Sequence, residues 1–366
     1  MKLLLLDQFS DLGGAQQVLL ELLPAIRQRG WCATVALPGN GKLRDAVRDS
    51  GFAVERIDFG PRLGTRIGAL AKSANADLVY LNGPRLLPAA AMAGLNCRVV
   101  FHSHSRVRLT AARTVAAMAL RWMHARVIAN CKFVAAQWRP IVPAGRIAMI
   151  MNGVAGPPNL PRRPLSCPPC IGCVGRISPE KGQREFVAAA AIINASLPGC
   201  RFAICGDPLF GNPKALRYAA QVRQSTLGLP IEFRGWQTDV YALLAELDIL
   251  LVPSLGPEAT TRVIPEAFAA GVPVIAFDTG GIPEVVEHGL TGMLVRSAEE
   301  MARLAVSLLT SDRERLFSMA AAARRAWEQR FTLAKFQQSV LQTLETVSGL
   351  QPLPNARQDR PPSGES

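Results

Sequence analysis

The chain has few aromatic residues, few histidines and no long apolar run. Only 6% of its 366 residues are aromatic, and four are histidines. The longest uncharged apolar run, around residues 86–95, covers about ten positions, whereas a helix that spans a bilayer needs roughly 20. Few aromatic side chains also mean few surfaces on which bases stack, so we expect no nucleic-acid partner.

A dinucleotide fingerprint is also absent. The sequence contains no G-x-G-x-x-G, and its second expected strand runs into Pro38-Gly39-Asn40 without ending at an acidic residue. Dinucleotide-binding domains use such glycines for the pyrophosphate and the acidic residue for the ribose. A nicotinamide-dependent dehydrogenase is therefore disfavoured.

The eight cysteines do not indicate a disulfide framework in a chain of this length without a secretion signal. The opening residues Met1–Asp7 resemble a short buried strand and are too few for a signal peptide. We expect a cytoplasmic protein, soluble or peripheral on the membrane. Cys167, Cys170 and Cys173 invite a zinc or iron–sulfur interpretation, but no second pair has matching spacing, so we expect buried, apolar cysteines and no metal.

Positive charge is concentrated in the first half. Residues 1–165 carry 22 Lys+Arg and 8 Asp+Glu, whereas residues 166–366 carry 19 and 20. Such an uneven distribution of charge indicates that the first half binds an anionic partner, and it gives no information about the fold. An anionic membrane, a phosphorylated lipid and a nucleic acid all fit the charge, and the low aromatic content disfavours the last.

Short apolar runs alternate with helical patterns along most of the chain. This alternation predicts parallel sheets covered by helices on both faces, in two doubly wound α/β domains. A proline-rich passage, residues 156–169, separates them, so we place the boundary at residue 160: domains 1–160 and 161–330, a final helix 331–349 and a disordered tail 350–366. The expected strands are Lys2–Leu6, Cys32–Leu37, Ala53–Asp58, Asp77–Leu81, Arg98–His102, Arg126–Ala129, Ile147–Met151, Cys170–Val174, Arg201–Cys205, Ile231–Phe233, Ile249–Val252, Val274–Phe277 and Met293–Val295. Two helices, Glu299–Arg330 and Thr332–Val347, are expected to follow.

In the first domain, Gly13 and Gly14 stand at a predicted helix start, where backbone amides can approach an anion or simply form a tight turn. His102 and His104 end a predicted strand, at the edge where open α/β sheets bind ligands. We expect one of them in an active site; ordinary surface or core positions and a metal site are the alternatives. The stretch Arg106–Arg126 predicts a basic amphipathic helix, which suits either an anionic membrane or an ordinary solvated face.

In the second domain, Arg176 and Lys181 follow the first strand and face the same crevice. Glu258 lies in a loop, and Glu266 lies in the first turn of a helix that Pro265 begins. Cations suit a diphosphate, and carboxylates suit sugar hydroxyls. Paired carboxylates also occur in glycosidases, but that chemistry leaves the two cations unexplained.

At this point the sequence resembles the family-4 retaining glycosyltransferases of the GT-B type, bacterial enzymes of cell-surface polysaccharide and glycolipid synthesis. The resemblance covers nearly the whole chain. Its markers are Gly13-Gly14, the His102/His104 segment, Asn152-Gly153-Val154, Gly175-Arg176, Lys181-Gly182, Gly206-Asp207-Pro208, Pro253-Ser254, the Glu258/Glu266 pair and Gly271-Val272-Pro273-Val274.

The resemblance implies two Rossmann-like domains facing a central cleft, with the acceptor on the first and the nucleotide sugar on the second. Arg176 and Lys181 would neutralise the donor diphosphate, Glu266 would hold the ribose and Glu258 would touch the sugar. Gly13 and Gly14 would close over the phosphates, one of His102 and His104 would reach the sugar or acceptor, and the final helix would return to the first domain. Retention by front-face attack and no metal or other cofactor are implied, in keeping with the absence of Asp-x-Asp.

One departure concerns the first glutamate. The family often has Glu-Gly-Phe-Gly, whereas Ala259, Thr260 and Thr261 follow Glu258 here. The resemblance implies that the backbone amides of these residues approach the donor sugar, so we expect them in the donor site, and the departure bears on the identity of the donor. A GT-B nucleotide-sugar epimerase and a non-catalytic nucleotide-sugar-binding protein are the alternative functions.

Overall fold

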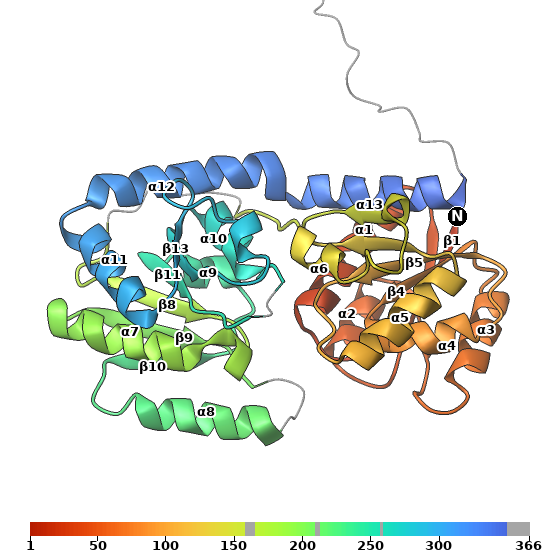
Figure 1. The fold of residues 1–366 in the computed structure, drawn as a ribbon, viewed down its shortest axis with the longest axis horizontal. Helices are drawn as coiled ribbons and strands as arrows, with labels where there is room; N and C mark the ends of the chain where they lie inside the picture. The colour runs from red at the N-terminus through yellow and green to blue at the C-terminus, as the bar shows by residue number, and fades with distance from the viewer. Residues whose placement is uncertain (158–164, 209–212, 257–258, 350–366) are drawn as a thin grey trace, which may run out of the picture.

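The computed structural model describes residues 1–157, 165–208, 213–256 and 259–349. Figure 1 shows two α/β domains side by side, with a long helical segment running across both. Each contains one parallel sheet, of seven and six strands. The predicted fold class, two doubly wound parallel-sheet domains, is confirmed.

The first sheet has the order β3-β2-β1-β4-β5-β6-β7. Four consecutive leucines make β1 apolar on both faces, as a central parallel strand requires. The strands are β1 (Lys2–Asp7), β2 (Cys32–Leu37), β3 (Ala53–Arg56), β4 (Leu78–Asn82), β5 (Arg98–Ser103), β6 (Arg126–Ala129) and β7 (Ile147–Met149). The helices between them are α1 (Gly14–Gln28), α2 (Lys42–Asp49), α3 (Leu63–Ser73), η1 (Pro84–Leu86), α4 (Leu87–Ala91), α5 (Thr110–Trp122), α6 (Lys132–Ala136) and η2 (Ala144–Arg146).

The second sheet has the order β10-β9-β8-β11-β12-β13. Its strands are β8 (Cys170–Val174), β9 (Arg201–Cys205), β10 (Ile231–Gly235), β11 (Ile249–Val252), β12 (Val274–Phe277) and β13 (Met293–Val295). The accompanying helices are η3 (Pro179–Lys181), α7 (Gln183–Ser196), α8 (Pro213–Ser225), α9 (Val240–Leu244), α10 (Val263–Ala270), η4 (Ile282–Glu284), α11 (Ala298–Thr310), α12 (Arg313–Ala326), η5 (Trp327–Phe331) and α13 (Leu333–Ser348).

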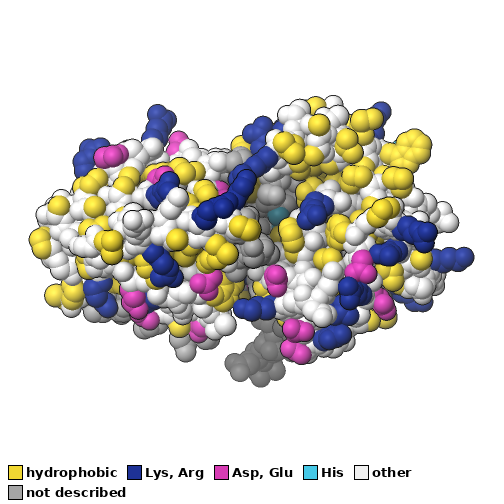
Figure 2. Space-filling view, turned by 90° about the horizontal axis from the view of Figure 1, so that it is seen from below, with side chains coloured by type: hydrophobic (Ala, Val, Ile, Leu, Met, Phe, Trp, Pro, Cys, Tyr) yellow, Lys and Arg dark blue, Asp and Glu magenta, His cyan; other side chains and the backbone are white. Residues whose placement is uncertain are grey.

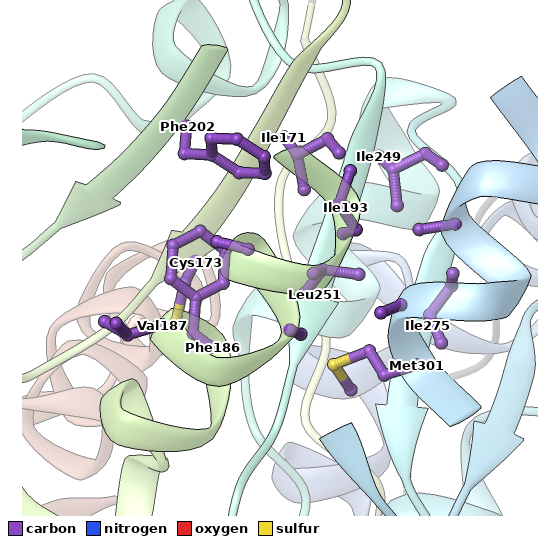
Figure 3. Packing of buried hydrophobic residues seen from close by; sticks show 14 of the residues in the cluster. Ile171, Cys173, Phe186, Val187, Ile193, Phe202, Ile249, Leu251, Ile275 and Met301 are labelled. Carbon is purple, nitrogen blue, oxygen red and sulfur yellow. The ribbon is translucent and has the colours of Figure 1, made fainter. Parts of the chain in front are cut away.

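The core of the second domain lies between the sheet and helices α7 and α11. Figure 3 shows Ile171, Ile249 and Ile275 from neighbouring strands close to Ile193 of α7 and Met301 of α11. All five are fully buried. This packing fixes the carboxyl ends of the strands, from which the loops of the candidate site emerge.

The chain passes between the domains twice, and the two passages touch. The Val154 amide donates to the Phe331 carbonyl at 2.9 Å, and the Leu333 amide donates to the Val154 carbonyl at 3.0 Å. The Trp327 indole also donates to Val154. After this contact α13 packs on α1 and β5, with Phe336 and Leu344 in the core of the first domain.

Several predicted strands end one or two residues away from the observed ones, and three local predictions differ more. The predicted helix Glu299–Arg330 is interrupted between α11 and α12, where the amides of Ser311 and Asp312 both turn back to the Ser307 carbonyl. The basic helix begins at Thr110 rather than Arg106. Cys167 is exposed, although Cys170 and Cys173 are buried in β8 as expected. The predicted tail, residues 350–366, lies outside the described residues.

Candidate active site between the two domains

The histidine pair lies at the carboxyl end of β5. His102 is buried, and its Nδ1 contacts the Tyr80 hydroxyl. His104 is partly exposed, and the two imidazole centroids are 3.9 Å apart. Burial lowers the pKa of both groups, that of His104 to about 3, so both are neutral near pH 7.

A buried polar network orients His104. Its Nε2 lies 2.6 Å from the Asn82 carbonyl oxygen, while the Asn82 amide nitrogen donates 2.5 Å to the Asp7 carboxylate. Gln16 also donates to Asp7, at 2.9 Å. The Asn82 orientation makes His104 Nε2 the protonated nitrogen, so Nδ1 is an acceptor; among the described residues it has no hydrogen-bond partner. The Nδ1 atom is buried, so a substrate hydroxyl group gains its lone pair only when the side chains around it move.

Sequence reasoning missed this network. Asp7 and Asn82 end two adjacent parallel strands, β1 and β4, and a polar residue at the end of an apolar strand is the signal that could have found them. Burial raises the pKa of Asp7 to about 6, against the hydrogen bonds from Asn82, the Phe9 amide and Gln16 that lower it.

Gly13 and Gly14 begin α1 on the same side of the first sheet. Gly13 is the N-cap, and no side chain caps this helix end. A Cβ atom at Gly14 would meet no heavy atom within 4 Å. The first-turn amides of α1 are thus approachable, as anion binding at a helix N-terminus requires.

The two predicted cations lie in the loop after β8. Arg176 forms a 2.6 Å ion pair with Glu180, and Lys181 Nζ donates 3.1 Å to the Thr261 hydroxyl. Burial raises the pKa of Glu180, but its own backbone hydrogen bond, Arg176 and Arg108 outweigh this effect and lower it. The Glu180 carboxylate is therefore charged and lies near two cations, Arg176 of its own domain and Arg108 of the first domain.

Residues 259–261 connect the two sides of the site. Asn130 of the first domain donates 3.3 Å both to the Thr260 hydroxyl and to the His104 carbonyl. Thr261, next in sequence, accepts from Lys181. Ala259 is buried in a cluster with Cys131 of the first domain. The structure thus brings the histidine segment and the basic loop together; the predicted site residue Glu258 lies outside the described residues.

Glu266 lies in the first turn of α10, as predicted, although this helix begins at Val263 rather than at Pro265. Its carboxylate is ion-paired. Arg262 Nε donates to Glu266 at 2.7 Å, and its Nη1 donates to Glu21 of α1 at 2.7 Å. Burial raises the pKa of Glu266, and Arg262 lowers it. The sequence analysis did not single out Arg262 or Glu21, which are 241 positions apart.

A second missed contact also crosses between the domains. The Glu284 carboxylate accepts hydrogen bonds from the amides of Lys132 at 2.7 Å and Phe133 at 2.8 Å, at the start of α6. The carboxylate thus satisfies amides that a helix N-terminus leaves without partners.

The surface is hollowed between the two halves of the molecule. Figure 2 shows histidine atoms at the bottom of this hollow. In the part of the chain that the structure describes, no three His, Cys, Asp or Glu side chains gather in a group that could hold a metal ion. No helix there is long and apolar enough to cross a membrane.

Comparisons with known proteins identify the family. Residues 12–155 match the model described as "Glycosyltransferase Family 4", and residues 168–311 match the one described as "Glycosyl transferases group 1". This chain belongs to the GT-B glycosyltransferases.

Relatives and solved structures agree with this assignment. The glycosyltransferase is 26% identical over 363 residues to phosphatidyl-myo-inositol mannosyltransferase of Mycolicibacterium smegmatis, covering 92% of this chain and 91% of that protein. Over 166 residues it is 33% identical to a Mycobacterium tuberculosis GDP-mannose-dependent α-(1-6)-phosphatidylinositol monomannoside mannosyltransferase, covering 43% and 42% of the two chains. The Anabaena HepE protein in complex with UDP superposes with a TM-score of 0.82 at 26% identity, covering 94% of this chain and all of that one. The predicted family and glycosyl-transfer function are confirmed, and the individual site residues stay predictions.

Proposed function

We propose that this glycosyltransferase retains the anomeric configuration, requires no metal ion, and moves a hexose from a nucleoside diphosphate sugar to a lipid-linked acceptor at the cytoplasmic face of a membrane. The contact that carries the proposal runs through Asn130, which joins the histidine segment to residues 260–261, where Lys181 is bound. This contact supports a site that combines a neutral imidazole with a loop that carries two cations. The relatives named for mannosyl transfer to phosphatidylinositol lipids support the acceptor class.

In this proposal the diphosphate binds between Arg176, Lys181 and the start of α1 at Gly13 and Gly14. Cations and helix-terminal amides stabilise an anion without a metal ion, which supports metal independence. Arg176 must then leave its ion pair with Glu180 and bind the donor phosphates instead. The Glu180 carboxylate therefore competes with the phosphates for Arg176.

The bonds change as follows. The acceptor hydroxyl oxygen attacks the anomeric carbon on the face from which the diphosphate leaves. The bond between that carbon and the diphosphate oxygen breaks, and the departing diphosphate takes the hydroxyl proton. Arg176 and Lys181 stabilise the charge that develops on the leaving group, and electrostatic stabilisation of this kind is often the largest catalytic contribution. Once the side chains around it move aside, His104 Nδ1, which is buried and has no hydrogen-bond partner among the described residues, accepts a hydrogen bond from a hydroxyl of the sugar or acceptor and orients it.

Donor binding tests the site directly. Thermal shifts are recorded with GDP-mannose and UDP-glucose for the wild type, Arg176→Ala, Lys181→Ala and the control Arg184→Ala. Arg184 lies on α7, bonded to Gln221 and stacked on Tyr218, outside the site. A ligand at 100 times its dissociation constant adds about 2.7 kcal/mol to the free energy of unfolding. We therefore expect the donor to raise the melting temperature of the wild type and of Arg184→Ala. We expect no such rise in Arg176→Ala or Lys181→Ala.

The reaction itself needs three further measurements. Proton NMR of the product gives the anomeric configuration, and activity after treatment with a chelator tests metal independence. An inverted product or loss of activity on chelation would contradict the corresponding part of the proposal. Conversion of the nucleotide sugar without any acceptor would instead indicate an epimerase.

A further inference from the structure

Arg262 uses its whole guanidinium group to hold two carboxylates from different domains. Its Nη1 and Nη2 donate hydrogen bonds of 2.7 Å and 2.5 Å to the two carboxylate oxygens of Glu21 in the first domain. Its Nε donates one of 2.7 Å to Oε1 of Glu266 in the second domain. A two-pronged pairing of this kind fixes orientation as well as distance. The position of the Glu266 carboxylate therefore depends, through Arg262, on a residue of the first domain.

Glu21 is itself held in place on α1. Its carbonyl oxygen accepts a 2.6 Å hydrogen bond from the side-chain amide of Gln337 on α13, and its Oε1 accepts one of 3.3 Å from Gln17. Glu21 lies seven residues after Gly14, which is about 10 Å along the helix axis. One helix therefore carries both the amides that we propose for the donor diphosphate and the carboxylate that holds Arg262.

The Glu266 carboxylate keeps one oxygen for a further hydrogen bond. Arg262 occupies Oε1, whereas Oε2 accepts no hydrogen bond from the residues that the structure describes and is not among the fully buried atoms that lack a partner. Burial raises the pKa of Glu266, and Arg262 lowers it, so the guanidinium favours the charged carboxylate. Hydrogen bonds to a charged oxygen are stronger than those to a neutral one. The site thus offers an oriented acceptor to a hydroxyl group.

A contact that only joined the domains would not need a residue of the donor site. The Glu284 carboxylate also joins them, but it binds backbone amides at the start of α6. Arg262 instead lies four residues before Glu266, in the segment that the family resemblance assigns to the donor, and it binds the carboxylate assigned to the ribose. The link between the domains therefore runs through a predicted donor residue.

We propose that Glu21 and Arg262 are positioning residues for the ribose of the donor. Glu21 orients the Arg262 guanidinium, the guanidinium fixes Oε1 of Glu266, and Oε2 then accepts a hydrogen bond from a ribose hydroxyl. Neither Glu21 nor Arg262 touches the donor in this arrangement. The inference rests on the proposed function, which binds a nucleoside diphosphate sugar. It goes further because it makes recognition of the ribose in the second domain depend on a residue of the first.

Titration calorimetry of the full chain with GDP, UDP and their 2′,3′-dideoxy analogues tests the proposal. We expect the wild type to bind one of the ribonucleotides, and to bind it more tightly than its dideoxy analogue. Glu21→Gln keeps the shape of the side chain and removes its charge. It should weaken binding of the ribonucleotide about fivefold or more, as coupling between separate sites does. Binding of the dideoxy analogue should be equal in both proteins, because that analogue lacks the hydroxyls that Glu266 would hold.

Glu284→Gln is the matched control, since it removes a carboxylate charge from the other contact between the domains. It should bind both nucleotides like the wild type. Arg262→Lys keeps the charge but cannot hold two carboxylates with one planar fork. Its affinity for the ribonucleotide should therefore fall between those of the wild type and Arg262→Met. Circular dichroism at the titration temperature checks that each variant is folded, and Glu21→Gln decides the outcome if Arg262→Met is not.

Three results would overturn the proposal. They are equal affinity of Glu21→Gln and the wild type for the ribonucleotide, an equal loss for the ribonucleotide and its dideoxy analogue, and the same loss in Glu284→Gln. The last two would identify the Glu21–Arg262 pair as a contact that only holds the domains together. A wild type that binds neither GDP nor UDP would instead refute the donor site of the proposed function, and this inference with it.

Discussion

Arg262 holds together two carboxylates that come from different domains, and its removal gives a prediction with a definite size. The side chains of Glu21 and Glu266 are each 12% exposed and that of Arg262 is 18% exposed. Arg262→Met keeps an apolar stem of similar thickness but removes the guanidinium and its charge, so both carboxylates remain largely buried without their cation. Breaking a buried pair costs about 3–5 kcal/mol, and partial exposure lowers our expectation to about 2–3 kcal/mol. Thermal unfolding should shift down by about 5–10 °C for a domain of this size.

The pH dependence makes this prediction more specific. Burial already raises the pKa of Glu266, and Arg262 is the cation that opposes the rise. An acid whose pKa is raised by folding contributes stability below its ordinary pKa, and the contribution is lost as the pH rises through the folded value. Without Arg262 that value is higher still. The loss in free energy of unfolding that Arg262→Met causes, relative to the wild type, should therefore be larger at about pH 8 than at about pH 5.

Differential scanning calorimetry of both proteins at the two pH values measures this deficit. Arg262→Lys is the matched comparison, because it keeps the charge but cannot hold two carboxylates with one planar fork, and it should lose less than Arg262→Met. A deficit below about 1 kcal/mol, or one that is the same at both pH values, would refute the reasoning, since either means that the carboxylates do not depend on the guanidinium.

Three further outcomes are expected. Gly206→Ala should destabilise the second domain by at least about 2 kcal/mol in denaturant unfolding, because its φ is 139° and a Cβ atom would lie 2.1 Å from a backbone oxygen; a change within error would contradict the strain. Glu284→Gln should cost about 1 kcal/mol, because the charge at the start of α6 is lost, and unchanged unfolding would show that the cap contributes nothing. The lowered pKa of His104 gives stability that is complete above about pH 6.5 and about 2 kcal/mol smaller at pH 5, offset in part by the raised pKa of Asp7. The fall in Tm from pH 7 to pH 5 should therefore be smaller in His104→Gln than in the wild type. An equal fall in the variant and the wild type would count against this effect of His104.

The buried strands could be predicted because their sequences alone identify them. Arg201–Cys205 and Val274–Phe277 have the predicted bounds, since short apolar runs between helices fit only a sheet covered on both faces. The break at Ser311 was not predicted, because the apolar pattern continues on both sides of it and only packing of α11 against α12 requires a turn.

Some residues of the candidate site could likewise be predicted from the sequence, and others could not. Arg176, Lys181 and Glu266 were predicted because each lies just after a strand or at a helix start, where local sequence fixes the position. The network around His104 and the partner of Arg262 were not predicted. Asn82 binds Asp7 at a separation of 75 positions and Arg262 binds Glu21 at a separation of 241, and a single sequence does not show which distant residues meet.

The return of α13 to the first domain has a consequence for how the chain is made. Val340 and Leu341 are at most 4% exposed and complete the apolar layer beside α1, together with Phe336 and Leu344. Each such side chain contributes about 1.5–3 kcal/mol when buried. Domains generally fold as units from the N-terminus during synthesis. In this chain the first domain leaves the ribosome before α13, which completes its core. The apolar surface that α13 covers therefore stays exposed to solvent until the whole second domain has been translated.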